Sequence, residues 1–404
     1  MAKLYKRIAS MMAPLLVISL LLSACGGDTT TPTATTGAGA TTAPAATDAT
    51  ATSPAGSAGS TDSTPAASGD DNAMIEASKN EKDGVLVYSI MSEKNWKPVL
   101  DGFDAKYPWI KVTTSDLGAY EVFERYYTES AGKARTADMI FTTAPDGWIN
   151  FMKKGEVDPY VAKEDAKIPA IGKIDKGLYA VSTDPMVFIW NKKLLTDPPK
   201  TMAELVAQIE KDPAKYEGKL VSYDATGEGF GYGLNWFYTK AKGDEGWKNL
   251  EAIGSTKPKI LTSGGKMIDS VVAGETILGF FVSNITVQPR IAAAKEILDY
   301  AFVPDAEVVA VRGMAVTKAA SSPNSARLLM DYILSEEGQI AFAKGGLTAY
   351  RPEIADQAPL HISQVSKAVG GDENLIYARP DPELADPTKH DEFLARWKKA
   401  LQRP

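Results

Sequence analysis

The sequence is poor in the residues that build disulfide frameworks and zinc centres. Its 404 residues include one cysteine and two histidines. One cysteine cannot form a disulfide within the chain, and these few side chains cannot supply the usual tetrahedral set of cysteine and histidine zinc ligands. An excess of basic residues is also absent, since 44 Lys and Arg stand against 51 Asp and Glu. A nucleic-acid binder needs a basic face, so we expect no nucleic-acid partner.

Catalytic signatures are absent as well. The part of the chain that we expect to fold contains no G-x-S-x-G, H-E-x-x-H or G-x-x-x-x-G-K-[ST] motif. The glycines at 227–233 alternate with other residues and do not fit G-x-G-x-x-G. His361 and His390 lie in polar stretches, where surface positions are expected. We therefore expect no enzyme, no cofactor and no metal site.

The first 25 residues have the pattern of an export signal. A basic start (Lys3, Lys6 and Arg7) precedes an apolar run at 11–22. This run is too short for a membrane span, which needs about 20 residues, but it is typical of a signal peptide. It ends in Leu22-Ser23-Ala24-Cys25, which resembles a bacterial lipobox. That resemblance implies cleavage before Cys25 and a lipid on its thiol; the alternative is an ordinary signal peptide with an incidental cysteine.

Residues 26–75 are predicted to be a disordered tether. From 26 to 70 the chain contains only Gly, Thr, Ala, Pro, Ser and Asp. Such a segment cannot bury enough apolar surface to offset the entropy of ordering its backbone. As a flexible coil of this composition, it would hold a domain about 35–40 Å from its anchor.

The remaining chain alternates short apolar runs with amphipathic helices, which indicates an α/β fold. Strands are predicted at 85–88, 110–113, 137–141, 179–181, 186–190, 219–223, 277–282 and 308–316. Helices are predicted near 96–103, 120–132, 201–209, 264–273, 325–334, 336–343 and 390–402. Thr201, with Glu204 three residues later, is predicted to cap one of them. The strand–helix–strand order predicts parallel strands with helices on both faces of the sheet.

Small polar residues follow several of these strands. Ligands of open parallel sheets bind beyond the carboxyl ends of the strands, where helix N-termini present free N–H groups. The candidates from this pattern are Ser89, Ser92, Thr142, Thr143, Thr226 and Gly227. Each could instead serve only as a helix cap, because Ser and Thr are favoured there.

The order of segments resembles bacterial extracellular solute-binding proteins of ABC importers. The branch that includes binders of ferric iron, thiamine, phosphonates and sugar phosphates is the most similar. The resemblance covers about residues 83–355, and its most specific part is GMAVTKAASSPNSARLLMDYILSEEGQIAFAKGGLTAYRPEI, from Gly313. Further support comes from ADMIFTTAPDGWINFMKKGEVDPY, from Ala137, and MIDSVVAGETILGF, from Met267.

The resemblance implies the type II periplasmic-binding-protein fold, which has two α/β lobes joined by crossing segments and a ligand cleft between the lobes. The crossings would lie near 182–184, 303–305 and 348–350. Lobe one would comprise 80–183 and 304–347, and lobe two 184–303 and 348–404. Further candidates for ligand binding are Thr183, Ser283, Asn284, Tyr350 and Arg351. Arg351 could equally be a surface residue of lobe two.

Iron is a poor match for this chain. The iron binders of the family use paired tyrosines, and the corresponding positions here read Ser283-Asn284-Ile285-Thr286. Hydroxyl and amide groups beside helix N-termini suit an oxyanion or a polyol better.

The implied function is that of a membrane-tethered solute-binding protein outside the cytoplasm. It would be a monomer that captures a small polar or anionic solute and delivers it to an ABC permease, and the lipid on Cys25 would hold it at the membrane. Two alternatives remain open: a surface lipoprotein hydrolase, and a ligand-binding subunit that feeds a sensor.

Overall fold

The computed structural model describes residues 71–226 and 231–403. The predicted signal peptide with Cys25, residues 26–70 of the predicted tether and Gly227 lie outside the described residues. Residues 71–75, which we expected to be tether, form the start of helix α1 (Asp71–Ser78). Met74 and Ile75 pack against the apolar core, which accounts for the order of this segment.

Eleven strands of the described chain form one hydrogen-bonded sheet, with the main order β2-β1-β3-β10-β5-β8-β6-β7. The strands are β1 (Val85–Ser89), β2 (Val112–Asp116), β3 (Met139–Thr142), β4 (Lys173–Asp175), β5 (Leu178–Asn191), β6 (Leu220–Tyr223), β7 (Lys259–Leu261), β8 (Leu278–Ser283), β9 (Leu298–Ala301), β10 (Glu307–Val316) and β11 (Leu375–Ala378). β11 pairs with β10, and β4 and β9 pair with β5.

The predicted parallel pairing holds at the two ends of the sheet and fails in its middle. β1 is parallel to β2 and β3, and β6 is parallel to β7 and β8. β5 and β10 are antiparallel to each other, and each is antiparallel to its next neighbour, β8 or β3. The predicted strands at 179–181 and 186–190 are one strand, β5, because the residues between them remain paired with β10.

The helices cover the sheet as the amphipathic pattern predicts. They are α2 (Glu93–Lys106), α3 (Glu121–Ala131), α4 (Pro145–Lys153), α5 (Met202–Lys211), α6 (Pro213–Tyr216), α7 (Gly231–Ser255), α8 (Gly264–Val272), α9 (Asn284–Ala294), α10 (Pro323–Leu334), α11 (Glu336–Lys344), α12 (Ile362–Val369) and α13 (Pro387–Ala400), with short 3-10 turns that include η5 (Pro382–Ala385). The predicted cap is confirmed, since the Glu204 N–H donates to Thr201 Oγ1 at 3.0 Å.

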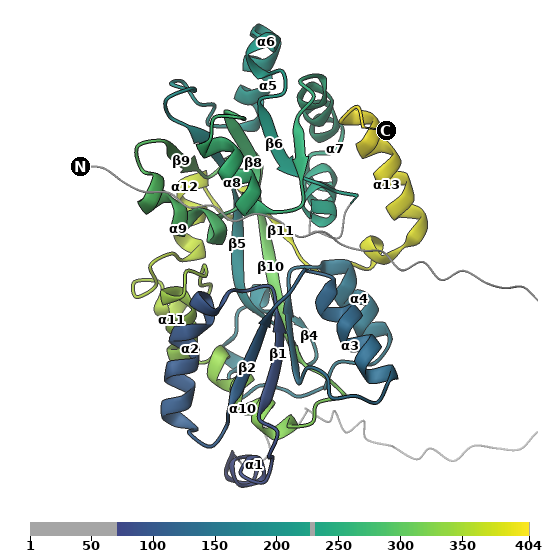
Figure 1. Ribbon diagram of the computed structural model, residues 1–404, viewed down its shortest axis with the longest axis vertical. Helices are drawn as coiled ribbons and strands as arrows, with labels where there is room; N and C mark the ends of the chain where they lie inside the picture. The colour runs from purple at the N-terminus through teal and green to yellow at the C-terminus, as the bar shows by residue number, and fades with distance from the viewer. Residues whose placement is uncertain (1–70, 227–230, 404) are drawn as a thin grey trace, which may run out of the picture. The chain divides into compact units, whose positions relative to one another are not determined.

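β5 and β10 run side by side between two groups of elements (Figure 1). We call the group around β1–β3, with α2–α4, α10 and α11, lobe one, and the group around β6–β8, with α5, α7–α9 and α13, lobe two. The apolar core of lobe two draws on 186–310 and 378–401. The cores of lobe one draw on 85–181 and 311–350. Thr183 and Thr348 pair in an isolated bridge at the crossing; the residue limits of the lobes stay predictions.

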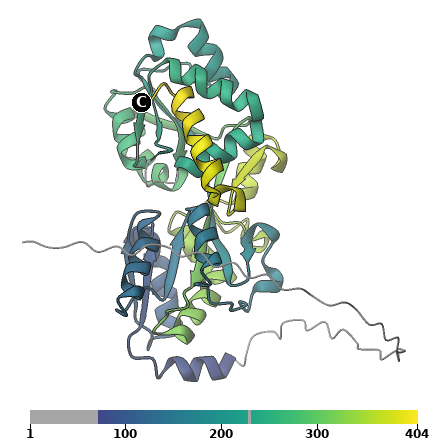
Figure 2. The same ribbon diagram turned by 90° about the vertical axis from the view of Figure 1, so that its right-hand side faces the viewer.

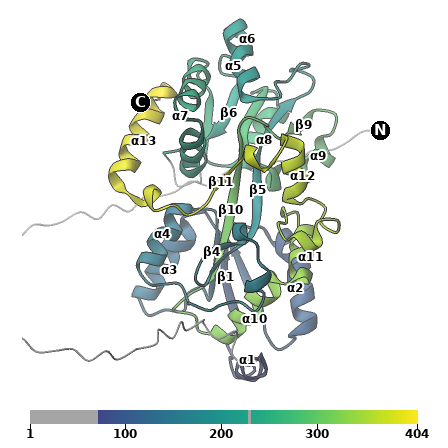
Figure 3. The same cartoon turned by 180° about the vertical axis from the view of Figure 1, so that it is seen from behind.

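Contacts between segments distant in the sequence complete each lobe. α2 packs beside α11 in lobe one, as both Figure 1 and the view from behind in Figure 3 show. The C-terminal helix α13 lies along α7 in lobe two (Figure 2). Phe393 and Trp397 of α13 are part of the lobe-two core. The end of the chain therefore belongs to the packing of lobe two.

Candidate functional site

The two crossing strands carry a buried ion pair. Arg312 of β10 is 3% exposed and Asp184 of β5 is 1% exposed. One terminal nitrogen of the Arg312 guanidinium donates to Ser182 Oγ at 2.8 Å, and the other donates to Asp184 Oδ2 at 3.4 Å. The register of β5 and β10 shifts between Arg312 and Gly313, and such a bulge redirects side chains. The bulge and these partners hold the guanidinium where the strands cross.

The negative charge of Asp184 is stabilised by hydrogen bonds from lobe two. Its carboxylate accepts from Ser283 Oγ at 2.6 Å and from the Ile285 N–H at 3.2 Å. Ser283 ends β8 and Ile285 lies in the first turn of α9, so the carboxylate faces the positive end of a helix. Burial nevertheless raises the pKa of Asp184 above its ordinary value.

The buried guanidinium of Arg312 has fewer hydrogen-bond partners than it has N–H groups. Burial lowers the pKa of its guanidinium, while the nearby Asp184 opposes that effect. The Nε–H of Arg312 has no hydrogen-bond partner among the described residues. A buried donor without a partner costs about 1–3 kcal/mol, and more when the group is charged. An anion placed beside Arg312 would therefore be stabilised.

A cavity of about 340 Å³ opens next to this pair. Lobe one contributes the residue after β1, the 117–119 loop and the residue after β3, and lobe two contributes residues from the ends of β6 and β8 and the starts of α8 and α9. We call this cavity the Arg312 compartment; it is lined by Ile90, Leu117, Gly118, Ala119, Thr143, Asp184, Tyr223, Thr262, Ser263, Gly264, Gly265, Ser283, Ile285, Thr286 and Arg312. Thr143 is 4% exposed, and its Oγ1 has no hydrogen-bond partner within the described chain.

Helix α8 begins at the wall of the Arg312 compartment. Its N-cap Ser263 accepts from the Lys266 N–H, and Ser263, Gly264 and Gly265 all line the cavity. A Cβ at Gly264 would lie 2.5 Å from the hydroxyl oxygen of Tyr223, so glycine permits the first turn to approach this side chain. The positive end of the α8 dipole adds to the field of Arg312.

A second cavity, of about 230 Å³, adjoins the same segments. We call it the Asp146 compartment; it is lined by Tyr120, Glu124, Asp146, Ala225, Thr226, Tyr232 and His390. The Tyr120 hydroxyl donates to Asp146 Oδ1 at 2.5 Å, and the rings of Tyr232 and His390 lie 4.8 Å apart. Burial raises the pKa of Asp146, and Tyr120 and the helix N–H groups oppose the shift.

The structure brings three of the predicted residues to these cavities. Thr143 and Ser283 line the Arg312 compartment, and Thr226 lines the Asp146 compartment. Ser283 binds Asp184, and Thr226 donates from its N–H and its hydroxyl to Asp224 Oδ1. Gly227 lies outside the described residues.

The other predicted residues are not among those that line either compartment. Ser89 accepts from Trp96 Nε1 at 3.0 Å, and Thr142 donates to the Ala119 carbonyl at 2.7 Å. Ser92 precedes α2 and donates to Asn95 Oδ1. Thr183 donates to the Thr348 carbonyl at 3.3 Å, and Asn284 accepts from Gln288 Nε2 at 3.0 Å. These contacts are the capping and strand-end roles that Ser, Thr and Asn commonly have.

Tyr350 and Arg351 make contacts within the protein core. The Tyr350 hydroxyl donates to the Ala180 carbonyl at 2.6 Å. Arg351 is fully buried, not on the surface of lobe two, and its guanidinium lies 3.0 Å from Glu164 and 3.1 Å from Glu353. Neither residue is among the lining residues of the two compartments.

Sequence reasoning missed Arg312, Tyr223 and His390. Arg312 had a readable signal, because it is the charged residue within the apolar run Val308–Val316. Such a residue in a buried strand needs a partner or a function. His390 was expected on the surface and does line a cavity, whereas His361 is buried. His361 accepts the Ser363 N–H at the start of α12, and its other ring nitrogen lies 3.0 Å from the Arg351 carbonyl.

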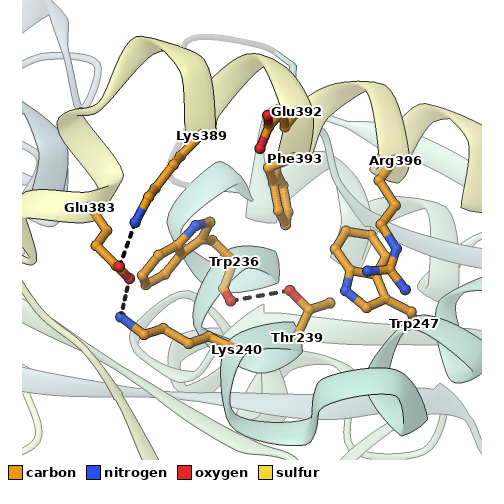
Figure 4. A pocket seen from close by; sticks show the side chains of 9 residues that line it. All are labelled: Trp236, Thr239, Lys240, Trp247, Glu383, Lys389, Glu392, Phe393 and Arg396. Carbon is orange, nitrogen blue, oxygen red and sulfur yellow. Dashed lines mark hydrogen bonds and ion pairs between the residues drawn. The ribbon is translucent and has the colours of Figure 1, made fainter.

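A further cavity, of about 400 Å³, lies between α7 and α13 (Figure 4). The side chains of Lys240 and Lys389 both point to Glu383, and Arg396 lies over the ring of Trp247 at 4.2 Å (Figure 4). All its lining residues come from lobe two and η5, and its two lysines both form ion pairs with Glu383. A ligand bound there would contact one lobe only.

No helix in 71–226 or 231–403 is long and apolar enough to cross a membrane. No group of three or more His, Cys, Asp or Glu side chains in those ranges is arranged to hold a metal ion.

Comparisons with known proteins agree with this architecture. The sequence model of the family described as "Bacterial extracellular solute-binding protein" matches residues 99–369. No curated protein sequence matches the chain significantly.

Solved structures of low sequence identity share the fold. The substrate binding protein of an ABC transporter from Agrobacterium tumefaciens is 24% identical, with a TM-score of 0.69 over 79% of this chain and 95% of that one. AfuA from Actinobacillus pleuropneumoniae, with fructose-6-phosphate bound, is 17% identical, with a TM-score of 0.62 over 79% and 98% of the chains. Iron-bound HitA from Pseudomonas aeruginosa is 19% identical, with a TM-score of 0.58 over 78% and 99%. The predicted two-lobe α/β fold of type II periplasmic binding proteins is confirmed.

Proposed function

Because the chain belongs to the bacterial extracellular solute-binding proteins, we propose that it captures a small polar or anionic solute outside the cytoplasm and delivers it to an ABC permease. The solute would bind in the Arg312 compartment, between the two lobes. One observation carries this proposal: the residues Arg312 and Thr143 line one cavity, and Arg312 Nε–H and Thr143 Oγ1 are buried without hydrogen-bond partners among the described residues. Native proteins rarely bury such groups without a ligand or water.

The two lobes supply complementary parts of this site. Thr143 belongs to lobe one, the start of α8 belongs to lobe two, and Arg312 lies on a strand that connects them. A solute that contacts all three stabilises the arrangement in which the lobes are close, because it has fewer contacts in any other arrangement. Hinge motion of the crossing strands would then couple binding to recognition by the permease. Binding and release need no catalytic step, so we propose no enzymatic activity.

The low-identity structures are compatible with an anionic solute without identifying it. AfuA has fructose-6-phosphate bound, and another similar protein has iron and citrate ligands. A thiamin-binding protein shares the fold as well. In this chain, the partly compensated guanidinium and the start of α8 favour an oxyanion.

The binding proposal is tested by identifying what the protein carries. The protein is purified from its native host without denaturant, then unfolded, and the released small molecules are analysed by mass spectrometry. We expect one dominant molecule in near-stoichiometric amount, and its return to refolded protein should raise the melting temperature in a concentration-dependent manner. A protein that carries no small molecule, and whose melting temperature no solute changes, would contradict the proposal.

We further propose that a lipid on Cys25 tethers the protein to the membrane. The support is the Leu22-Ser23-Ala24-Cys25 sequence after an apolar run. Mass spectrometry of the mature N-terminal peptide should find a diacylglyceryl cysteine. Cys25→Ser should move the protein from the membrane fraction to the soluble fraction, with the ligand affinity unchanged. An unmodified N-terminus, or membrane association of the variant, would contradict the tether and leave the binding function standing.

A further inference from the structure

The Arg312 and Asp146 compartments are lined by neighbouring segments of the chain. Ala119 lines the first and Tyr120 the second. Tyr223 lines the first, and Ala225, two residues later, lines the second. In lobe one, the Thr142 hydroxyl donates to the Ala119 carbonyl at 2.7 Å, and this hydrogen bond joins the end of β3 to the loop that contains Ala119. The walls of the two compartments are therefore built partly from the same stretches of chain.

The two compartments differ in charge. The Arg312 compartment contains a guanidinium whose Nε–H lacks a partner in the described chain, together with the start of α8. Its one carboxylate, Asp184, already accepts from Ser283, Ile285 and Arg312. The remaining field in this compartment favours a negative ligand group.

The Asp146 compartment has the opposite preference. Among the described residues that line it, the carboxylates are Asp146 and Glu124 and the only basic side chain is that of His390. Asp146 accepts from the neutral Tyr120 hydroxyl, so this hydrogen bond leaves the negative charge in place. Tyr120 and Tyr232 add aromatic rings, and such rings attract cations within about 6 Å. A carboxylate flanked by aromatic rings suits an ammonium or another organic cation.

We infer that the solute is amphoteric, with a carboxylate, phosphate or phosphonate group in the Arg312 compartment and a cationic group in the Asp146 compartment. This inference rests on the proposed function, because it assumes that the cleft holds the transported solute. Residues that border the two compartments are adjacent or nearly adjacent in the chain, so one small molecule with both groups can extend from one compartment into the other.

The test compares matched sets of probes on refolded, ligand-free protein by isothermal titration calorimetry. Each set contains an ω-amino carboxylate or ω-amino phosphonate, the same acid without the amine, and the same amine without the acid. At least one amphoteric probe should bind about tenfold or more tightly than both of its single-charge analogues, since each charged hydrogen bond contributes substantially. Equal affinity for the amphoteric probe and its acid analogue would overturn the inference.

Variants assign the two groups to their compartments. Asp146→Asn should weaken the amphoteric probe about tenfold and leave the acid analogue unchanged, because the variant removes one charge and keeps the shape. Asp269→Asn is the matched control, since Asp269 pairs with Arg290 at 2.9 Å and lines neither compartment. A D146N variant that binds the amphoteric probe as tightly as the wild type would contradict the assignment.

The molecule released from native protein shows whether only the amphoteric-solute inference fails or whether the proposed function fails as well. A released solute with only negative charge, or with none, overturns the inference and leaves the proposed function intact. A released amphoteric solute supports the inference even when its spacer differs from all probes. Absence of any released solute, together with no binding of any probe, overturns both.

Discussion

The guanidinium of Arg312 lies 3.4 Å from the carboxylate of Asp184, across the two strands that connect the lobes. Both groups are buried, and buried ion pairs rarely add net stability because desolvation offsets their attraction. A long pair with a partnerless Nε–H on one side is more costly than a complete pair. Its position beside the cleft accounts for this arrangement, since a bound anion would complete the coordination of Arg312.

The first prediction concerns the stability of this pair. Arg312→Met leaves Asp184 buried without its cation, so the free energy of unfolding should fall by about 3–5 kcal/mol in ligand-free protein. The double variant D184N/R312M should recover part of that loss, since it buries no charge at this place. Urea denaturation measures both changes. As a matched control, R290M breaks the exposed pair with Asp269 and should cost less than about 1 kcal/mol.

The second prediction separates ligand binding from folding. Thr143→Val removes a buried hydroxyl that has no partner within the described residues, so the melting temperature without ligand should stay the same or rise. Affinity for the solute should fall about fivefold to tenfold, because one hydrogen bond to the ligand is lost.

Thr239→Val is the control for this experiment. Thr239 is also a buried threonine, but it lines the cavity between α7 and α13 and donates to the Asn235 carbonyl at 3.0 Å. The Thr239→Val variant should leave the affinity for the solute unchanged. The opposite result, with T239V weakening binding and T143V not, would place the solute between α7 and α13.

The sequence predicts elements well where local rules decide the structure. Thr201 caps its helix because its hydroxyl accepts a nearby N–H, and β1 and α2 follow from short-range patterns of apolar residues. Helix α7 (Gly231–Ser255) was missed altogether, and the glycines at 231 and 233 disfavour a helix at its start. A Cβ at Gly231 would lie 2.2 Å from the Asp224 carbonyl oxygen, so the close approach of the helix start to the end of β6 requires the glycine.

The site was predictable only in part for a similar reason. Small polar residues after strands identified Thr143 and Thr226, but the same pattern selected Ser89 and Thr142, whose hydroxyls bond to Trp96 and to the Ala119 carbonyl. Which hydroxyl faces the cleft depends on the rotation of the chain at each strand end. Arg351 has an equally ambiguous context, and its burial against Glu164 depends on contacts 187 residues apart in the sequence.

The third prediction concerns Gly313, which follows Arg312 on β10. A Cβ at this position would lie 2.6 Å from Trp148 Nε1, and this nitrogen donates to the Thr142 carbonyl at 3.1 Å. Gly313→Ala should therefore destabilise the protein by about 1–3 kcal/mol through overpacking and should displace the strand end that carries Thr143. Melting temperature and solute affinity should both fall. Gly132→Ala is the matched control, because a Cβ there would meet backbone oxygens at an ordinary 3.5 Å and its φ of −77° suits alanine.

The fourth prediction concerns Glu307, a fully buried carboxyl on β10. Its Oε2 accepts the Val303 N–H at 2.7 Å, and burial raises its pKa well above the ordinary value. The folded state therefore holds a proton that the unfolded state releases above a pH of about 4.3. Stability from this group is complete below the unfolded pKa and is lost as the pH rises toward the folded pKa, with a slope of up to about 1.4 kcal/mol per pH unit.

Glu307→Gln removes this dependence, because the amide oxygen can still accept the Val303 N–H and does not titrate. The difference in unfolding free energy between the variant and the wild type should grow in favour of the variant from about pH 5 upward. Urea denaturation at a series of pH values measures it, and parallel profiles would refute the burial argument.

Glu383 should show the opposite dependence of stability on pH, since Lys240 and Lys389 lower its pKa to about 2. Any effect of Glu383→Gln should be a loss of stability that appears above the ordinary carboxyl pKa and vanishes in acid.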